Sequence, residues 1–142
     1  AGPDGNVWFA EEGTHKIGVI TPAGVIKELP LPGGSFPSAI TAGPDGNMWF
    51  TDYFGKVGSM TMLGAVTEFG NGITGDQVTA IVAGPDGNLY FVVGQGNQIG
   101  KVTTGGSITE YAANDTPQGI ALGPDGNIWF TEFCTSKVAR LQ

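Results

Sequence analysis

The sequence has little of what marks disulfide-stabilised, membrane or nucleic-acid-binding proteins. Its 142 residues include one cysteine, Cys134, so no disulfide can form within the chain. Basic residues are few, six against thirteen acidic ones, and the net charge of −7 repels phosphate backbones. No apolar run approaches the roughly 20 residues that a membrane-spanning helix needs. We therefore expect no nucleic acid and no membrane among its partners, and a soluble protein that is either cytoplasmic or secreted in mature form.

Glycine, in contrast, is abundant, and much of it belongs to a repeat. The pentapeptide GPDGN begins at Gly2, Gly43, Gly84 and Gly123, which gives a nearly constant period. A fixed period near 40 residues is typical of repeat architectures. Because proline fixes φ and Asp-Gly allows a corner with positive φ, each pentapeptide predicts a tight turn between two strands. The single domain, 1–142, then divides into four units at about 1–38, 39–79, 80–118 and 119–142.

The second unit shows what surrounds each turn. Short runs rich in β-branched and aromatic residues predict strands at 39–42, 47–52, 56–61 and 65–69. No segment has a sustained helical period. Four antiparallel strands in about 40 residues form one blade of a β-propeller, so we predict an all-β fold of four-stranded antiparallel blades. The four units together hold about 3.5 blades per chain.

An open arc of blades predicts a partner. Such an arc leaves an apolar flank at each end and unpaired backbone groups in its incomplete sheets. We expect a homodimer through the terminal blades, so that a second chain completes the ring. A fragment or complementing half of a longer propeller is the main alternative, and a closed four-unit monomer is the third. The aromatic residue that follows each turn is expected to pack between blades, in preference to forming a platform for a ligand.

The loops at one end of the arc collect the candidate ligand-binding residues. Strands alternate in direction, so the loop after the second strand of each unit and the loop before the first strand share this end. A concave mouth with convergent polar groups is the default place for a small-molecule ligand. The residues that these loops deliver are Glu11, Glu12, Ser38, Asp52, Tyr53, Thr79, Gln118 and Glu132. For the acidic residues, pairing with backbone amides of the loop is a competing interpretation.

Few residues of the chain suggest catalysis or metal binding. His15, the only histidine, and the nearby Glu12 are the candidates for acid–base work, because imidazole titrates near neutral pH. His15 occupies a position that holds Gly55 and Asn97 in other units. Because both are turn-forming residues, the preferred interpretation is that His15 is a turn residue without a catalytic role. The aspartates of GPDGN lack the dense spacing of a calcium loop, so an Asx turn is preferred and no metal site is predicted. Cys134 is interpreted as a free thiol in a loop of the fourth unit.

Several motifs together resemble one known family. GPDGNIWFTE at 123–132, KIG at 16–18, ITEY at 108–111 and the pattern P-x-[GA]-I at 37–40 and 117–120 are similar to the repeat of the streptogramin B (virginiamycin B) lyases. The similarity covers essentially the whole chain. It implies a seven-bladed propeller that opens a cyclic depsipeptide at its ester by magnesium-assisted elimination.

The catalytic residues that the resemblance implies are not matched. In the family, histidines occupy the x of P-x-[GA]-I, but the x positions here hold Ser38, Thr79 and Gln118. A family glutamate three residues after a strand phenylalanine is matched only by Glu12. We therefore predict a non-catalytic binding or scaffold propeller that assembles into a closed ring. The alternative is a metal-dependent C–O lyase with Mg²⁺ as its cofactor, and a passive structural repeat is a third hypothesis.

Overall fold

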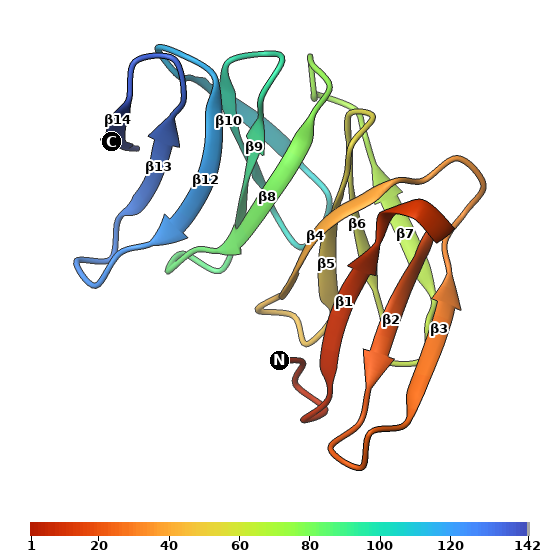
Figure 1. The fold of residues 1–142 in the computed structure, drawn as a ribbon. Helices are drawn as coiled ribbons and strands as arrows, with labels where there is room; N and C mark the ends of the chain where they lie inside the picture. Colours follow the sequence, from red (N-terminus) through yellow and green to blue (C-terminus); the bar gives the residue numbers. More distant parts are fainter. Residues whose placement is uncertain (142) are drawn as a thin grey trace.

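The computed structural model of the protein describes residues 1–141, and these form an all-β fold. Fourteen strands are arranged in four antiparallel sheets that lie side by side along an arc (Figure 1). The first and fourth sheets have three strands each, and the second and third have four. This arrangement confirms the predicted propeller architecture. Fourteen strands correspond to the predicted 3.5 blades of four strands each.

The first two sheets cover residues 7–69. The first contains β1 (Val7–Glu11), β2 (Lys16–Ile20) and β3 (Ile26–Pro30), with a 3₁₀ turn, η1 (Glu12–Thr14), between β1 and β2. The second contains β4 (Pro37–Ala42), β5 (Met48–Asp52), β6 (Lys56–Met60) and β7 (Val66–Phe69).

The other two sheets cover residues 78–140. The third contains β8 (Val78–Ala83), β9 (Leu89–Val93), β10 (Gln98–Val102) and β11 (Ile108–Ala112). The fourth contains β12 (Pro117–Leu122), β13 (Ile128–Glu132) and β14 (Lys137–Arg140).

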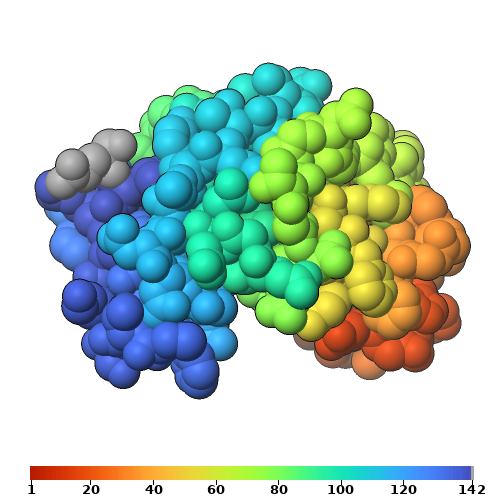
Figure 2. Space-filling view, turned by 90° about the horizontal axis from the view of Figure 1, so that it is seen from above, coloured from red at the N-terminus to blue at the C-terminus, as the bar shows by residue number. Residues whose placement is uncertain are grey.

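Each sheet is an antiparallel meander in which the strands follow one another in chain order. β4, β8 and β12 begin the second, third and fourth sheets, and each lies against its counterpart in the neighbouring sheet. In the first sheet, it is β1 that lies against β4 of the second sheet. Seen from above, the red N-terminal sheet and the blue C-terminal sheet are the two ends of the arc, with a notch in the outline between them (Figure 2).

The GPDGN turns are built in the same way in all four sheets. In the second sheet, Gly46 takes a φ of +79° and the Gly43 amide donates to the Asn47 carbonyl at 2.8 Å. The Asp45 carboxylate accepts from the Asn47 amide at 3.2 Å, which confirms the expected Asx turn. It also accepts from the indole Nε1–H of Trp49 at 3.0 Å, so the turn holds the buried aromatic residue of the next strand.

The aromatic residue after the turn packs between sheets, as expected, in the first three units, whereas Trp129 of the fourth unit is partly exposed. Trp8 joins a core cluster with Met48 and Phe50 of the second sheet. Trp49 stacks on Phe69 and joins a cluster with residues of the third sheet. Tyr90 packs with Ile128 and Phe130 of the fourth sheet. Apolar burial between successive sheets is therefore what holds the arc together.

Within residues 1–141, the structure contains no helix with the length and hydropathy that crossing a membrane would require.

The turn aspartates allow a matched test of the indole hydrogen bond. Asp45→Ala leaves the Nε1–H of Trp49 unpaired in a fully buried site, because Trp49 is 0% exposed. We expect the free energy of unfolding to fall by roughly 2 kcal/mol. Asp125→Ala removes the same contact from Trp129, whose indole is partly exposed and can bind water, so its loss should be smaller. Urea unfolding measures both, and equal losses would show that burial of the indole does not matter.

Candidate functional site

The two sets of loops that were predicted to share one end do meet there. The loop after the second strand in a unit donates backbone hydrogen bonds to the loop before the innermost strand. In the second sheet Tyr53 N–H donates to the Phe36 carbonyl at 2.9 Å, and in the fourth Phe133 N–H donates to the Thr116 carbonyl at 2.9 Å. The Tyr53 carbonyl also accepts from the Gln77 amide at 2.7 Å, which ties the second sheet to the start of the third.

The x residues of P-x-[GA]-I occupy irregularities in the innermost strands. β4 pairs with β5 at Pro37 and again at Ile40, with a register shift between them that contains Ser38. The same shift contains Thr79 in β8 and Gln118 in β12. A β-bulge re-aims the side chain of the extra residue, and bulges are common beside ligand sites. The motif thus encodes a bulge that turns one side chain out of the regular alternation at the mouth.

Hydroxyl groups of the neighbouring strand fix two of these bulges. The Ala39 amide donates to Oγ1 of Thr51 at 2.9 Å, and the Gly119 amide donates to Oγ1 of Thr131 at 2.9 Å. In the third sheet the corresponding residue is Val92, which has no hydroxyl to offer. The bulge that holds Thr79 therefore lacks the side-chain support that the other two have.

A cavity of about 280 Å³ brings two of the predicted ligand residues together. It lies between the starts of β8 and β12, and its wall contains the predicted Thr79 and Gln118. Sequence reasoning missed the other lining residues. The full lining is Gln77, Thr79, Gly94, Thr116, Pro117 and Gln118. The side chains that can form hydrogen bonds here are uncharged amides and hydroxyls.

Gln77 takes an unusual backbone conformation in this wall. Its φ is +60°, in the left-handed region that costs energy for a residue with a side chain. Its amide donates to the Tyr53 carbonyl, and its carbonyl accepts from Gly94 N–H at 3.0 Å. The other two units have a proline after the equivalent residue, which would disfavour helical backbone angles there. Val78 takes the place of that proline, and this exchange is the sequence signal that could have drawn attention to Gln77.

Asp115 holds the backbone in place on the side of the cavity that Thr116 lines. Its carboxylate accepts from the Thr116 amide at 2.7 Å and from the Thr135 amide at 2.6 Å. The Thr116 hydrogen bond, helped by that of Thr135, holds the pKa of Asp115 below its ordinary value. This aspartate therefore stays ionised near neutral pH and ties the loop that precedes β12 to the loop after β13.

Two of the acidic residues that were predicted to bind a ligand are buried in the structure. Asp52 is 1% exposed and Glu132 is 4% exposed. Oδ1 of Asp52 accepts from Phe54 N–H at 3.0 Å, and Oε2 of Glu132 accepts from the Thr135 hydroxyl at 3.2 Å. Their other carboxylate oxygens have no hydrogen-bond partner within the described residues. These contacts support the interpretation that the acidic residues satisfy loop groups.

The remaining predicted residues lie away from the cavity lining. Glu11 accepts from the Thr14 hydroxyl at 2.7 Å, and Glu12 is exposed in η1. Ser38 is half-buried in β4. Tyr53 is half-buried, and its ring lies nearly perpendicular to that of Phe54.

His15 sits in a turn, in the conformation that its position requires. Its φ is +59°, and the equivalent residues Gly55, Asn97 and Ser136 also have positive φ. Its Nδ1 lies 2.8 Å from the Ser35 carbonyl oxygen. Its ring packs nearly perpendicular to the Phe36 ring, with the two ring centroids 4.4 Å apart. One ring nitrogen is therefore occupied by a backbone carbonyl. The arrangement supports the interpretation of His15 as a turn residue.

The described residues do not assemble a metal site by themselves. In the part of the chain that the structure describes, no three His, Cys, Asp or Glu side chains are grouped so that they could hold an ion. Mg²⁺ is usually held through carboxylates, but the two buried ones, Asp52 and Glu132, lie in different sheets, and each uses one oxygen for a loop group. The donor set of this chain alone does not fit the magnesium ion that the family resemblance implies.

Comparison with known proteins identifies close similarity to one family. The model of the virginiamycin B lyase family matches residues 1–142. Virginiamycin B lyase from Staphylococcus aureus is 40% identical, with a TM-score of 0.94 over 99% of this chain and 50% of its own. A catalytically inactive histidine-to-alanine variant of the S. aureus enzyme with quinupristin gives 40% identity and a TM-score of 0.93, over 99% of this chain and 50% of that one. A streptogramin B lyase is 35% identical, with a TM-score of 0.90 over 99% of this chain and 48% of that one.

This chain thus spans about half the length of these solved relatives. The WD40 propeller domain of Doa1 matches at 16% identity and a TM-score of 0.79, over 96% of this chain and 46% of that one, which supports the fold alone. No curated protein sequence matches the chain.

Substitutions at His15 test its assignment to the turn. His15→Gly removes one hydrogen bond but relieves the positive φ, so we expect the free energy of unfolding to stay within about 1 kcal/mol. His15→Val places a β-branched residue at positive φ and should cost roughly 2 kcal/mol. Chemical denaturation measures both. A glycine variant that is as unstable as the valine variant would contradict the assignment.

Proposed function

The chain belongs to the virginiamycin B lyase family, and we propose that it is a non-catalytic binding module of that propeller type. In this proposal, the cavity between β8 and β12 holds a peptide-like ligand at the channel mouth. The bulged side chains of Thr79 and Gln118, together with Gln77, form hydrogen bonds to its amide and ester groups. No proton transfer is assigned to these residues.

The observation that carries the proposal is the chemistry of the cavity wall. Thr79, Gln118 and Gln77 line it with hydroxyl and amide groups, which can both donate and accept hydrogen bonds. Such groups suit the alternating N–H and C=O groups of a peptide. A threonine hydroxyl or a glutamine amide does not accept a proton near neutral pH, so it cannot act as a general base. The wall therefore favours recognition over acid–base catalysis.

The relatives indicate which peptide class to test. The inactive S. aureus variant was solved with quinupristin. The family resemblance implies cyclic depsipeptides, whose backbone offers several carbonyl acceptors to one cavity. A cavity of about 280 Å³ is small for a whole ring of this kind. We therefore infer that it receives one side of the ligand and that the rest lies over the mouth.

A lyase activity that depends on further residues is the second candidate. It is favoured by 40% identity to virginiamycin B lyase over 99% of this chain. Because that relative is twice as long, a base and metal ligands could be supplied from another part of a complete ring. No step through Mg²⁺ is assigned to the present residues, since they do not form its donor set.

Titration with quinupristin separates binding from catalysis. We expect saturable binding by calorimetry, and the variants Thr79→Ala and Gln118→Ala should each weaken it about 5- to 10-fold, the effect of one hydrogen bond. Thr104→Ala, an exposed threonine in a turn at the opposite end, is the matched control and should bind unchanged. Circular dichroism of each variant checks that the fold is intact.

The same samples, incubated with Mg²⁺, are then examined by chromatography and mass spectrometry. Elimination within a ring adds and removes no atoms overall, so a linear product would have the mass of quinupristin and a different retention time. We expect unchanged quinupristin. A linear product would favour the lyase, and absence of binding to the unsubstituted protein would refute the proposal.

A further inference from the structure

A second cavity opens at the mouth between the loops of the second and third sheets. Its volume is about 430 Å³, and polar groups form most of its wall. The loop after β5 supplies Phe54 and Gly55, and the loop after β9 supplies Gln95. The loop between β7 and β8 supplies Thr74 and Asp76. Figure 2 shows this last loop, in yellow-green, beside the green loop after β9. None of these residues lines the first cavity, the one of about 280 Å³ described above.

The two cavities share one wall. The Gln95 amide donates to the Asp76 carbonyl at 3.2 Å, and the Gly94 amide donates to the Gln77 carbonyl at 3.0 Å. Asp76 and Gln95 line the second cavity, whereas Gln77 and Gly94 line the first. The hydrogen-bonded segments 76–77 and 94–95 therefore lie between the two cavities. A ligand in the first cavity lies next to the second.

The Asp76 carboxylate stands in the wall of the second cavity without a basic partner. Within the described residues it forms no ion pair, and Lys56 is paired with Glu68 at 3.1 Å instead. A Cβ atom on Gly55 would lie 3.3 Å from Oδ1 of Asp76, so this oxygen is next to the residue that follows Phe54. The other units have larger residues at the position of Gly55. The glycine therefore leaves room for the carboxylate.

A second carboxylate beside this wall lacks the lysine that its counterparts have. In the first two sheets the equivalent glutamates, Glu28 and Glu68, each form an ion pair with a lysine. In the third sheet Gln98 replaces that lysine. The carboxylate of Glu110 accepts from the amide and the hydroxyl of Thr74 instead, at 3.1 and 2.7 Å. Since Thr74 lines the cavity, a cation placed there is attracted by two carboxylates.

Phe54 brings an aromatic ring to the same cavity. Its side chain is 53% exposed, but neighbouring groups hold it in place. Its amide donates to the buried carboxylate of Asp52 at 3.0 Å. Its ring is nearly perpendicular to those of Phe36 and Tyr53, with centroids 5.0 and 5.5 Å away. The face of an aromatic ring attracts a cation, and a ring beside a carboxylate suits an organic ammonium group.

We propose that the second cavity binds the ammonium group of a peptide-like ligand, such as a lysine side chain or an amine substituent. The Asp76 carboxylate pairs with the cation, and the Phe54 ring packs against it. A divalent metal ion is a poorer occupant, because such ions need several oxygen ligands and a phenyl ring supplies none. The proposal rests on the proposed function in one respect: the same ligand lies in the first cavity, across the shared wall.

A matched pair of small probes tests the second cavity by itself. Nα-acetyl-lysine N-methylamide carries an ammonium group, and Nα-acetyl-norleucine N-methylamide is its uncharged counterpart. Backbone amide chemical shifts are measured by NMR while each probe is added up to tens of millimolar. We expect saturable changes at Gly55, Asp76 and Gln95 with the lysine derivative. The norleucine derivative should cause no saturable change at these residues.

Three substitutions test the groups that hold the cation. Asp76→Asn removes the charge with little change of shape and should weaken binding of the lysine derivative about 5-fold. Phe54→Leu removes the ring and should weaken it about 3-fold. Glu12→Gln is the matched control, because Glu12 is an exposed carboxylate in another loop at the same end. It should bind the lysine derivative unchanged, and circular dichroism checks the fold of each variant.

Three results would overturn the proposal. The first is the absence of saturable changes at Asp76 with the lysine derivative, and the second is equal binding of the norleucine derivative. The third is an equal loss of affinity in Asp76→Asn and Glu12→Gln, since attraction to the acidic surface as a whole would then explain the binding.

The titration with quinupristin reports separately on Thr79 and Gln118 of the first cavity. If quinupristin does not bind while the lysine derivative still binds at Asp76, the proposed function is refuted and the cation site stands.

Discussion

The packing of each sheet on the next is the interaction on which the rest of the structure depends. Within one sheet, backbone hydrogen bonds satisfy the strands, but both faces remain apolar and a single blade cannot bury them alone. The contact between successive sheets removes Trp49, Phe50 and Phe91 from water. It also fixes the angle between the sheets, and that angle brings the starts of β8 and β12 together at the mouth. The cavity is thus a consequence of core packing between the third and fourth sheets.

Much of the fold could be predicted from the sequence, because its signals are local and repeated. The GPDGN turn uses one proline and one glycine with positive φ, and the four copies fix where the strands begin. The bond from the turn aspartate to the indole was not predicted. Its donor and acceptor lie four residues apart, and only the folded turn brings them within hydrogen-bond distance. The burial of Asp52 was also missed, since its position in the sequence resembles that of an exposed loop residue.

The candidate site was predicted in part. The x positions of P-x-[GA]-I were identified from the pattern, but the pattern does not reveal that they occupy bulges. Gln77 was missed because its importance arises from a backbone conformation, which Val78 permits where other units have proline. Thr79 and Gln118 are far apart in the sequence, and only the packing of the third sheet on the fourth places them in one cavity. Local sequence therefore predicts which side chains lie at the mouth better than it predicts which of them meet.

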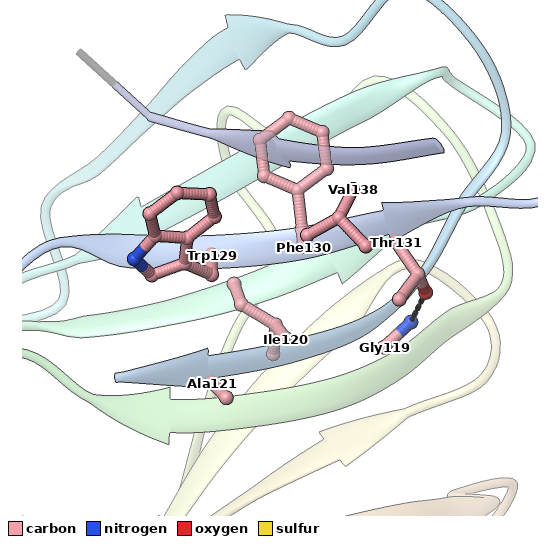
Figure 3. A pocket seen from close by; sticks show the side chains of 7 residues that line it. All are labelled: Gly119, Ile120, Ala121, Trp129, Phe130, Thr131 and Val138. Atoms are coloured by element: carbon pink, nitrogen blue, oxygen red, sulfur yellow. Dashed lines mark hydrogen bonds between the residues drawn. The ribbon is translucent and has the colours of Figure 1, made fainter. Parts of the chain in front are cut away.

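The central claim is that the ligand binds in the polar cavity at the mouth, and not in the apolar hollow that Trp129 and Val138 line in the fourth sheet (Figure 3). Backbone amide chemical shifts measured by NMR during addition of quinupristin test this most directly. The account predicts that the largest changes occur at Gln77, Thr79 and Gln118, with little change at Trp129 and Val138. Changes centred on Trp129 and Val138 would contradict it, because the ligand would then occupy the apolar hollow of the fourth sheet and not the polar cavity.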